Sequence, residues 1–126
     1  MPTPEELRQL VQRYADAVSA GDPAAVAAMF RPDAVQTDPA TAPPNVGRDA
    51  IATFFENAAA ASEGTRFEAL AVHTAGSFAA IDFRVTVTLE SNTMRIEGIE
   101  VFDVDDDGLI RTVTAYWDDA DVSIES

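Results

Sequence analysis

Two side chains that lie in apolar runs of this sequence are the first candidates for chemistry. Tyr14 lies where apolar residues recur every three or four positions, and Glu100 lies where they recur every second position. A carboxyl group on an apolar strand face favours its neutral form, because loss of water penalises the charge and raises the pKa. A neutral carboxylic acid and a tyrosine hydroxyl both donate hydrogen bonds, and donors held in a dry cavity stabilise a developing oxyanion.

Each of these residues also has an ordinary structural interpretation. Buried tyrosines are commonly core residues with a satisfied hydroxyl group, and an inward glutamate can pair with an arginine. Neither residue is specific for catalysis when it is taken alone. Whether the two side chains can act together therefore depends on the helix and the strand that position them.

The first helix should place Tyr14 against the core. Thr3-Pro4-Glu5-Glu6 has the pattern of a capping box with proline at the first helical position, and the helix that it begins should end near Gly21. Asp22-Pro23 should begin a second, shorter helix that carries Val26, Met29 and Phe30. That helix should stop before Pro32, because the residue before a proline disfavours helical dihedral angles.

The proline-rich stretch 33–45 is expected to form a short strand and then a loop, and Asp38 lies in that region. Asp49 is expected to cap a third helix, which should end before Gly64. All three predicted helices thus fall in the first half of the chain.

The second half changes from helical spacing to alternation. Residues 79–90, 94–102 and 112–117 each alternate between apolar and polar or small side chains, and Asp107-Gly108 is a strong hairpin signal. Glu100 shares an apolar face with Phe102 in the second of these runs. Helices followed by antiparallel hairpins predict an α+β fold, with the helices packed on one face of a curved sheet, and the length favours one domain over residues 1–126.

The charge balance argues against two classes of partner. The chain has 22 acidic and 8 basic residues, so its surface should repel phosphate backbones and anionic lipid headgroups. We therefore expect neither a nucleic-acid nor a membrane partner. The absence of cysteine excludes disulfides and thiolate metal sites, and the first residues lack the pattern of a signal peptide, so we expect a cytoplasmic protein.

Two further signals receive a structural interpretation. The acidic run from Asp103 to Gly108 matches the opening of a calcium loop, but Thr114 stands at the twelfth position and strand patterns flank it, so an acidic, solvated hairpin turn is expected. His73 has no partner set for a metal or a nucleophile nearby in the sequence. We interpret it as a plain strand residue.

Several motifs together carry a family resemblance. The segment Asp33-Ala34-Val35-Gln36-Thr37-Asp38-Pro39, followed by Gly47-Arg48, resembles the base-bearing segment of the bacterial Δ5-3-ketosteroid isomerases. These enzymes belong to the cone-shaped superfamily named after nuclear transport factor two. The resemblance covers nearly the whole chain, with further matches at Val11-Gln12-Arg13-Tyr14, Ala20-Gly21-Asp22, Gly98-Ile99-Glu100-Val101-Phe102 and Ala115-Tyr116-Trp117.

The resemblance implies a role for three residues and a departure at one of them. Tyr14 matches the oxyanion-hole tyrosine, Asp38 matches the base that moves the proton, and Glu100 stands where the known enzymes have an aspartic acid. That aspartic acid is itself the standard example of a carboxyl kept neutral at pH 7 by its apolar site. The resemblance also places a set of apolar residues on the wall of the substrate pocket: Phe30, Phe55, Phe83, Phe102, Val113, Ala115 and Trp117.

The implied activity is isomerisation of a Δ5-3-ketosteroid in steroid metabolism, by a homodimer that needs no cofactor or metal. Two alternatives stay open from the sequence. One is another enzyme of the same fold, such as a polyketide cyclase or a dehydratase that uses the same aspartate. The other is a non-catalytic module for ligand binding or dimerisation.

Overall fold

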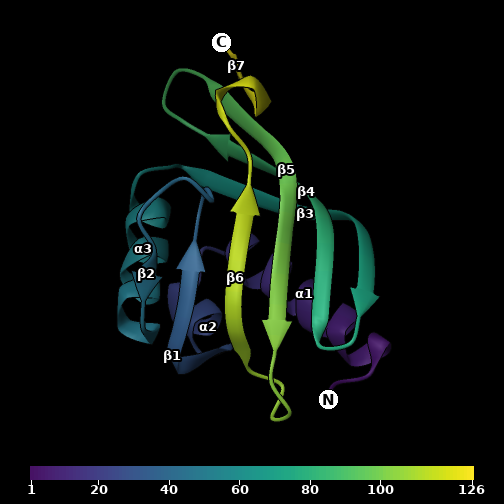
Figure 1. Cartoon of the computed structure of the whole chain (residues 1–126). Coiled ribbons are helices and arrows are strands. Elements are labelled where there is room, and N and C mark those ends of the chain that lie inside the picture. The colour runs from purple at the N-terminus through teal and green to yellow at the C-terminus, as the bar shows by residue number, and fades with distance from the viewer.

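The computed structural model describes all residues 1–126, as three helices on one face of a seven-stranded sheet (Figure 1). The strand order is β2-β1-β6-β5-β4-β3, with β7 paired to β5. All pairs are antiparallel except β1 with β6, so the predicted α+β fold with a mostly antiparallel sheet is confirmed. The elements are α1 (Pro4–Ser19), α2 (Pro23–Ala27), β1 (Phe30–Thr37), β2 (Asn45–Val46), α3 (Arg48–Ala60), β3 (Gly64–Ala75), β4 (Phe78–Thr88), β5 (Thr93–Val104), β6 (Ile110–Tyr116), the 3₁₀ turn η1 (Asp119–Asp121) and β7 (Val122–Glu125).

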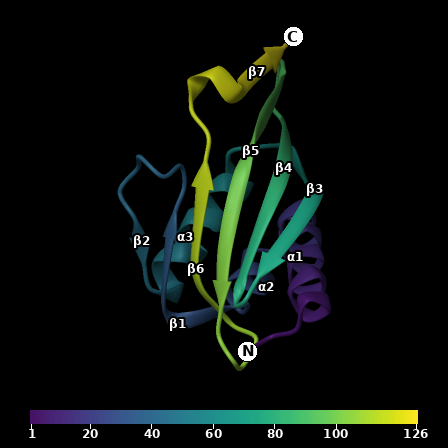
Figure 2. The same ribbon diagram turned by 45° about the vertical axis from the view of Figure 1, so that its right-hand side comes forward.

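Helix α1 begins at the predicted capping box. The Thr3 hydroxyl accepts from the Glu6 amide at 3.1 Å, and the Glu6 carboxylate accepts from the Thr3 amide at 2.9 Å. The helix packs on β3 (Figure 2). Its buried face includes Tyr14. No helix combines the length and the apolarity that crossing a bilayer requires.

The segment between α2 and α3 differs from the sequence prediction in two places. Helix α2 already ends at Ala27, because the Met29 carbonyl accepts from the Ile110 amide at 2.8 Å and draws the chain into the sheet. The prediction that Asp49 caps α3 was wrong. The N-cap is Gly47, whose φ of 93° is a conformation that favours glycine, and Asp49 lies inside the first turn, where its charge suits the helix dipole.

The long strands β4 and β5 confirm the predicted alternation. Glu100 pairs with Ile81 of β4 and Ala115 of β6, and all three side chains are buried on the face that the helices cover. Ile99 points to the opposite face and is exposed. The inner face of the sheet therefore supplies both the core and the wall on which Glu100 sits.

The acidic turn after β5 is organised around Asp105. Its Oδ1 accepts from the amides of Asp107 and Leu109 at 2.9 Å, and its Oδ2 pairs with Arg31 at 2.8 Å. These bonds hold the pKa of Asp105 below its usual range, although burial opposes them. The turn is thus closed by its own backbone and by Arg31, as a hairpin requires.

Candidate active site

An apolar cavity of about 670 Å³ lies between the helices and the inner face of the sheet. Its wall comes from α1, α2, α3, β3, β4 and β5, together with the segments that follow β1 and β6. Tyr14, Asp38 and Glu100 all line it, and no basic residue does. The structure therefore brings the three predicted catalytic residues into one enclosure, although 86 positions separate Tyr14 from Glu100 in the chain.

Glu100 is an acid held in its neutral form. Its side chain is only 3% exposed, and burial raises its pKa to about 8, with a further contribution from the charge of Asp38. The nearby Tyr14 hydroxyl, a hydrogen-bond donor, acts in the opposite direction. Glu100 Oε1 is buried without any hydrogen-bond partner in the protein. An unpartnered carboxyl oxygen in a cavity wall is available to a ligand.

Tyr14 supplies a second donor next to Glu100. Its ring is edge-on to three phenylalanines, with centroid distances of 6.1 Å to Phe55, 5.5 Å to Phe67 and 5.0 Å to Phe102. Burial, and then the nearby carboxyl groups of Glu100 and Asp38, raise the pKa of Tyr14 well above its usual value. The phenol therefore keeps its proton, and the aromatic cage fixes the direction of its hydroxyl group.

Asp38 follows the end of β1 and is half-buried. Its Oδ1 accepts from the indole Nε1 of Trp117 at 2.7 Å, and the loop behind it is tied to β6 by a 2.7 Å bond from the Ala40 amide to the Ala115 carbonyl. Burial raises the pKa of Asp38, and the Trp117 bond partly offsets this rise. The Trp117 indole thus fixes the Asp38 carboxylate in place and stabilises its charge with a hydrogen bond inside a largely apolar cavity.

The two carboxyl groups differ in their protonation. Asp38 has one hydrogen-bond donor and some solvent contact, whereas Glu100 is almost fully buried and has the higher pKa. When Asp38 ionises first, its charge raises the pKa of Glu100 further. Two acids whose environments separate their pKa values are the arrangement of a base and an acid. The cavity can therefore remove a proton with Asp38 and bind an oxyanion with Glu100 and Tyr14.

The predicted pocket wall is present only in part. Phe55, Phe83 and Trp117 line the cavity. The remaining four lie in the core beside it, and each is at most 2% exposed: Phe30, Phe102, Val113 and Ala115. Alternation turns Phe102, Val113 and Ala115 to the inner face, where they belong to the hydrophobic core together with Phe30. Phe102 still contacts the site indirectly, through the ring of Tyr14.

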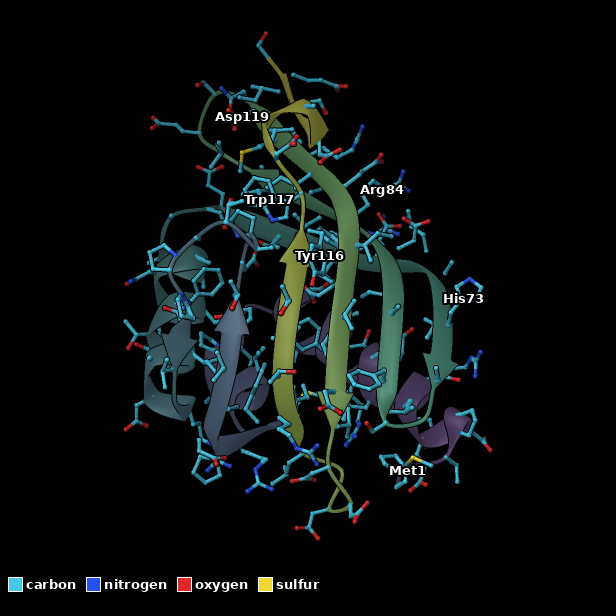
Figure 3. All side chains as sticks on the ribbon, in the orientation of Figure 1. Met1, His73, Arg84, Tyr116, Trp117 and Asp119 are labelled. Atoms are coloured by element: carbon cyan, nitrogen blue, oxygen red, sulfur yellow. The ribbon has the colours of Figure 1, made fainter.

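Other wall residues were not predicted as part of a pocket. They are apolar and come from five elements: Val18, Phe54, Phe67, Val85 and Ile96. Val18 belongs to the apolar stripe of α1, and Val85 and Ile96 lie in the two alternating runs, so a signal for burial existed at all three. His73 lies on the edge strand β3, away from Trp117 (Figure 3), which agrees with its interpretation as a strand residue.

A buried neutral glutamate makes the stability of the fold depend on pH. Above pH 4.5 Glu100 ionises in the unfolded chain, while the folded protein keeps it neutral up to about pH 8. The free energy of unfolding therefore falls as pH rises through that window. The Glu100→Gln variant has no ionisable group at this position. Denaturant unfolding from pH 5 to pH 8 should show the variant gaining about 3–4 kcal/mol relative to the unchanged protein. Parallel stability curves would show that Glu100 is not held neutral.

Comparisons with known proteins agree with this class of fold. A family model described as the SnoaL-like domain matches residues 11–113. The steroid Δ-isomerase of Nocardioides simplex is 40% identical over 119 residues, which are 94% of this chain and 95% of that protein. The chain therefore belongs to the SnoaL-like family, in the nuclear transport factor two-like superfamily, and is a homologue of a steroid Δ-isomerase.

A solved structure extends the likeness of fold. It is that of SalBIII, an epoxide hydrolase/cyclase-like enzyme in pyran ring formation of the polyether salinomycin. The TM-score is 0.91, and the match covers 99% of this chain and 100% of that chain. Because the identity is 21%, this likeness is one of fold alone.

Proposed function

We propose that the protein is a steroid Δ5-3-ketone isomerase. It converts a Δ5-3-ketosteroid to the conjugated Δ4-3-ketosteroid by moving one proton through a dienolate. The observation that carries the proposal is that one cavity holds a partly solvated Asp38 together with a buried Glu100 whose Oε1 has no partner. The 40% identity to a steroid Δ-isomerase supports the choice of reaction.

The proposed mechanism assigns one step to each group. The Asp38 carboxylate removes a proton from the carbon between the ketone and the alkene, and electron density moves onto the ketone oxygen. Tyr14 and neutral Glu100 donate hydrogen bonds to that oxygen as its charge develops. The protonated Asp38 then returns the same proton two carbons further along, which restores the ketone and leaves the alkene conjugated. Side chains of this one chain thus carry out both proton transfers and bind the charged oxygen.

The cavity suits an apolar substrate. Its volume of about 670 Å³ lies within the ~300–1,000 Å³ typical of small-molecule sites, and most of its wall is apolar. Burial of a steroid skeleton against Phe55, Phe83 and Trp117 would supply affinity at ~25 cal/mol per Å² of apolar surface. The ketone is then the one substrate group that needs hydrogen-bond donors at the inner end.

Binding of a steroid phenol tests the proposed oxyanion site. In a complex with an equilenin-like ligand, Tyr14 Oη and a Glu100 carboxyl oxygen should both lie within ~3.2 Å of the phenolic oxygen. The same steroid without that oxygen is the control, and it should bind about tenfold or more weakly, because charge-assisted hydrogen bonds contribute ~1.5–3 kcal/mol. A complex in which Glu100 does not contact the ligand oxygen would remove it from the mechanism.

The homodimer implied by the family resemblance is a further proposal. Four large apolar side chains on four strands are exposed: Leu70, Phe78, Ile99 and Tyr116. Tyr116 and Ile99 are direct partners across β6 and β5. Exposed apolar side chains on neighbouring strands of a sheet support pairing with a second copy.

A further inference from the structure

Gly98 lies where the end of β6 and the residue after it come close to β5. It is on the inner face of β5, two residues before Glu100, and it pairs with Phe83 of β4. A Cβ atom at this position would lie 2.4 Å from the Tyr116 carbonyl oxygen, 3.1 Å from the Trp117 Cβ and 3.2 Å from a ring carbon of Phe83. Gly98 does not have a positive φ. The need for glycine therefore comes from the close approach and not from the backbone conformation.

The close approach involves the residue that holds the base. Strand β6 ends at Tyr116, opposite Ile99 of β5, and the next residue is Trp117 (Figure 3). From there the indole Nε1 reaches Asp38 Oδ1 at 2.7 Å. The nearest obstacle to a side chain at position 98 is a backbone oxygen, so the clash cannot be relieved by a change of rotamer.

We infer that Gly98 is a positioning residue for Asp38, acting through Trp117. Its missing side chain lets the Tyr116–Trp117 peptide lie against β5, and this seats the indole on the carboxylate. A methyl group at position 98 would push that peptide away by about 1 Å to reach an ordinary non-bonded distance. A 2.7 Å hydrogen bond does not survive such a displacement with its geometry intact.

The consequence of the displacement follows from the groups that face Asp38. They are the indole of Trp117, which lowers the pKa of Asp38, and the cavity groups Glu100 and Tyr14. Burial raises the pKa of Asp38, and the hydrogen bond from the indole lowers it. Without that hydrogen bond the pKa of Asp38 rises further. The role of Gly98 in turnover rests on the proposed function, whereas its role in seating the indole does not.

The single tryptophan gives a direct readout that does not need turnover. In a ¹⁵N–¹H spectrum its indole N–H resonance should shift with pH as Asp38 ionises, which gives one titration step. Asp38→Asn should remove that titration step. Gly98→Ala should shrink the step or move its midpoint to higher pH. The matched control is Glu97→Ala, which alters an exposed position of the same strand outside the cavity and should leave the pH-dependent shift of the indole resonance unchanged.

Turnover supplies the second readout. Gly98→Ala should lower kcat by about 10–100-fold with little change in KM, since misplacement of ~1 Å can cost ~10²-fold. A folded Gly98→Ala protein with the original indole titration would overturn the inference. So would a variant that does not fold, because Gly98 would then support the whole sheet. If Gly98→Ala changes the indole titration but the protein converts no Δ5-3-ketosteroid, the proposed function fails and the positioning role stands.

Discussion

Asp38→Asn is expected to fold normally and to lose nearly all isomerase activity. A general base typically contributes ~10²–10⁴-fold, and Asp38 is proposed to act in both proton transfers. The substitution keeps the shape of the side chain, and the amide oxygen of asparagine can still accept from Trp117 Nε1. The loss should therefore appear in kcat, while the affinity for a steroid phenol changes little.

Asp82→Asn is the matched control for this prediction. Asp82 lies on β4 with an exposed side chain, outside the cavity, so the same chemical change there should leave turnover unaltered. Steady-state kinetics on one Δ5-3-ketosteroid compares the two variants directly. Isomerisation by Asp38→Asn at the unchanged rate would show that another group moves the proton.

Substitutions at Glu100 should rank by the donor that they leave in the cavity. Glu100→Ala removes the donor, and losing one oxyanion-hole donor typically costs ~10²–10³ in turnover. Glu100→Gln keeps a neutral donor of the same length, but an amide is a weaker acid and stabilises the developing charge less. Glu100→Asp restores the group found in the known isomerases, so the expected order of damage is alanine, then glutamine, then aspartate.

The measurement is kcat for the three variants, with the melting temperature of each as a control for folding. Water that enters the space left by alanine would reduce its loss without changing the order. Full turnover in all three variants would mean that Glu100 is only a buried acid. Such a result would leave Tyr14 as the one donor for the oxyanion.

Local rules explain what could be predicted from the sequence. The capping box of α1 joins residues three positions apart, and the alternation that turns Glu100 inward is a property of any strand. These features do not depend on the rest of the fold. The apolar surroundings of Glu100, and hence its raised pKa, could be inferred for the same reason.

Features that depend on distant parts of the chain could not be predicted. The bond from Trp117 to Asp38 joins residues 79 positions apart and arises from the parallel pairing of β1 with β6. Alternation also cannot tell how far along a strand the cavity extends. The resemblance placed Val113 and Phe102 on the pocket wall, and alternation along the strands could not show that they lie in the core.

Conversion of a Δ5-3-ketosteroid, followed by ultraviolet absorbance, tests the central claim most directly. The conjugated enone of the product absorbs where the unconjugated substrate does not, so the proposed activity predicts a rise in absorbance that scales with protein concentration. The rise should disappear in the Asp38→Asn protein, which keeps the cavity but lacks the base. An absorbance trace no faster than that of buffer alone, from protein that is folded and binds a steroid phenol, would contradict the assignment of isomerase activity.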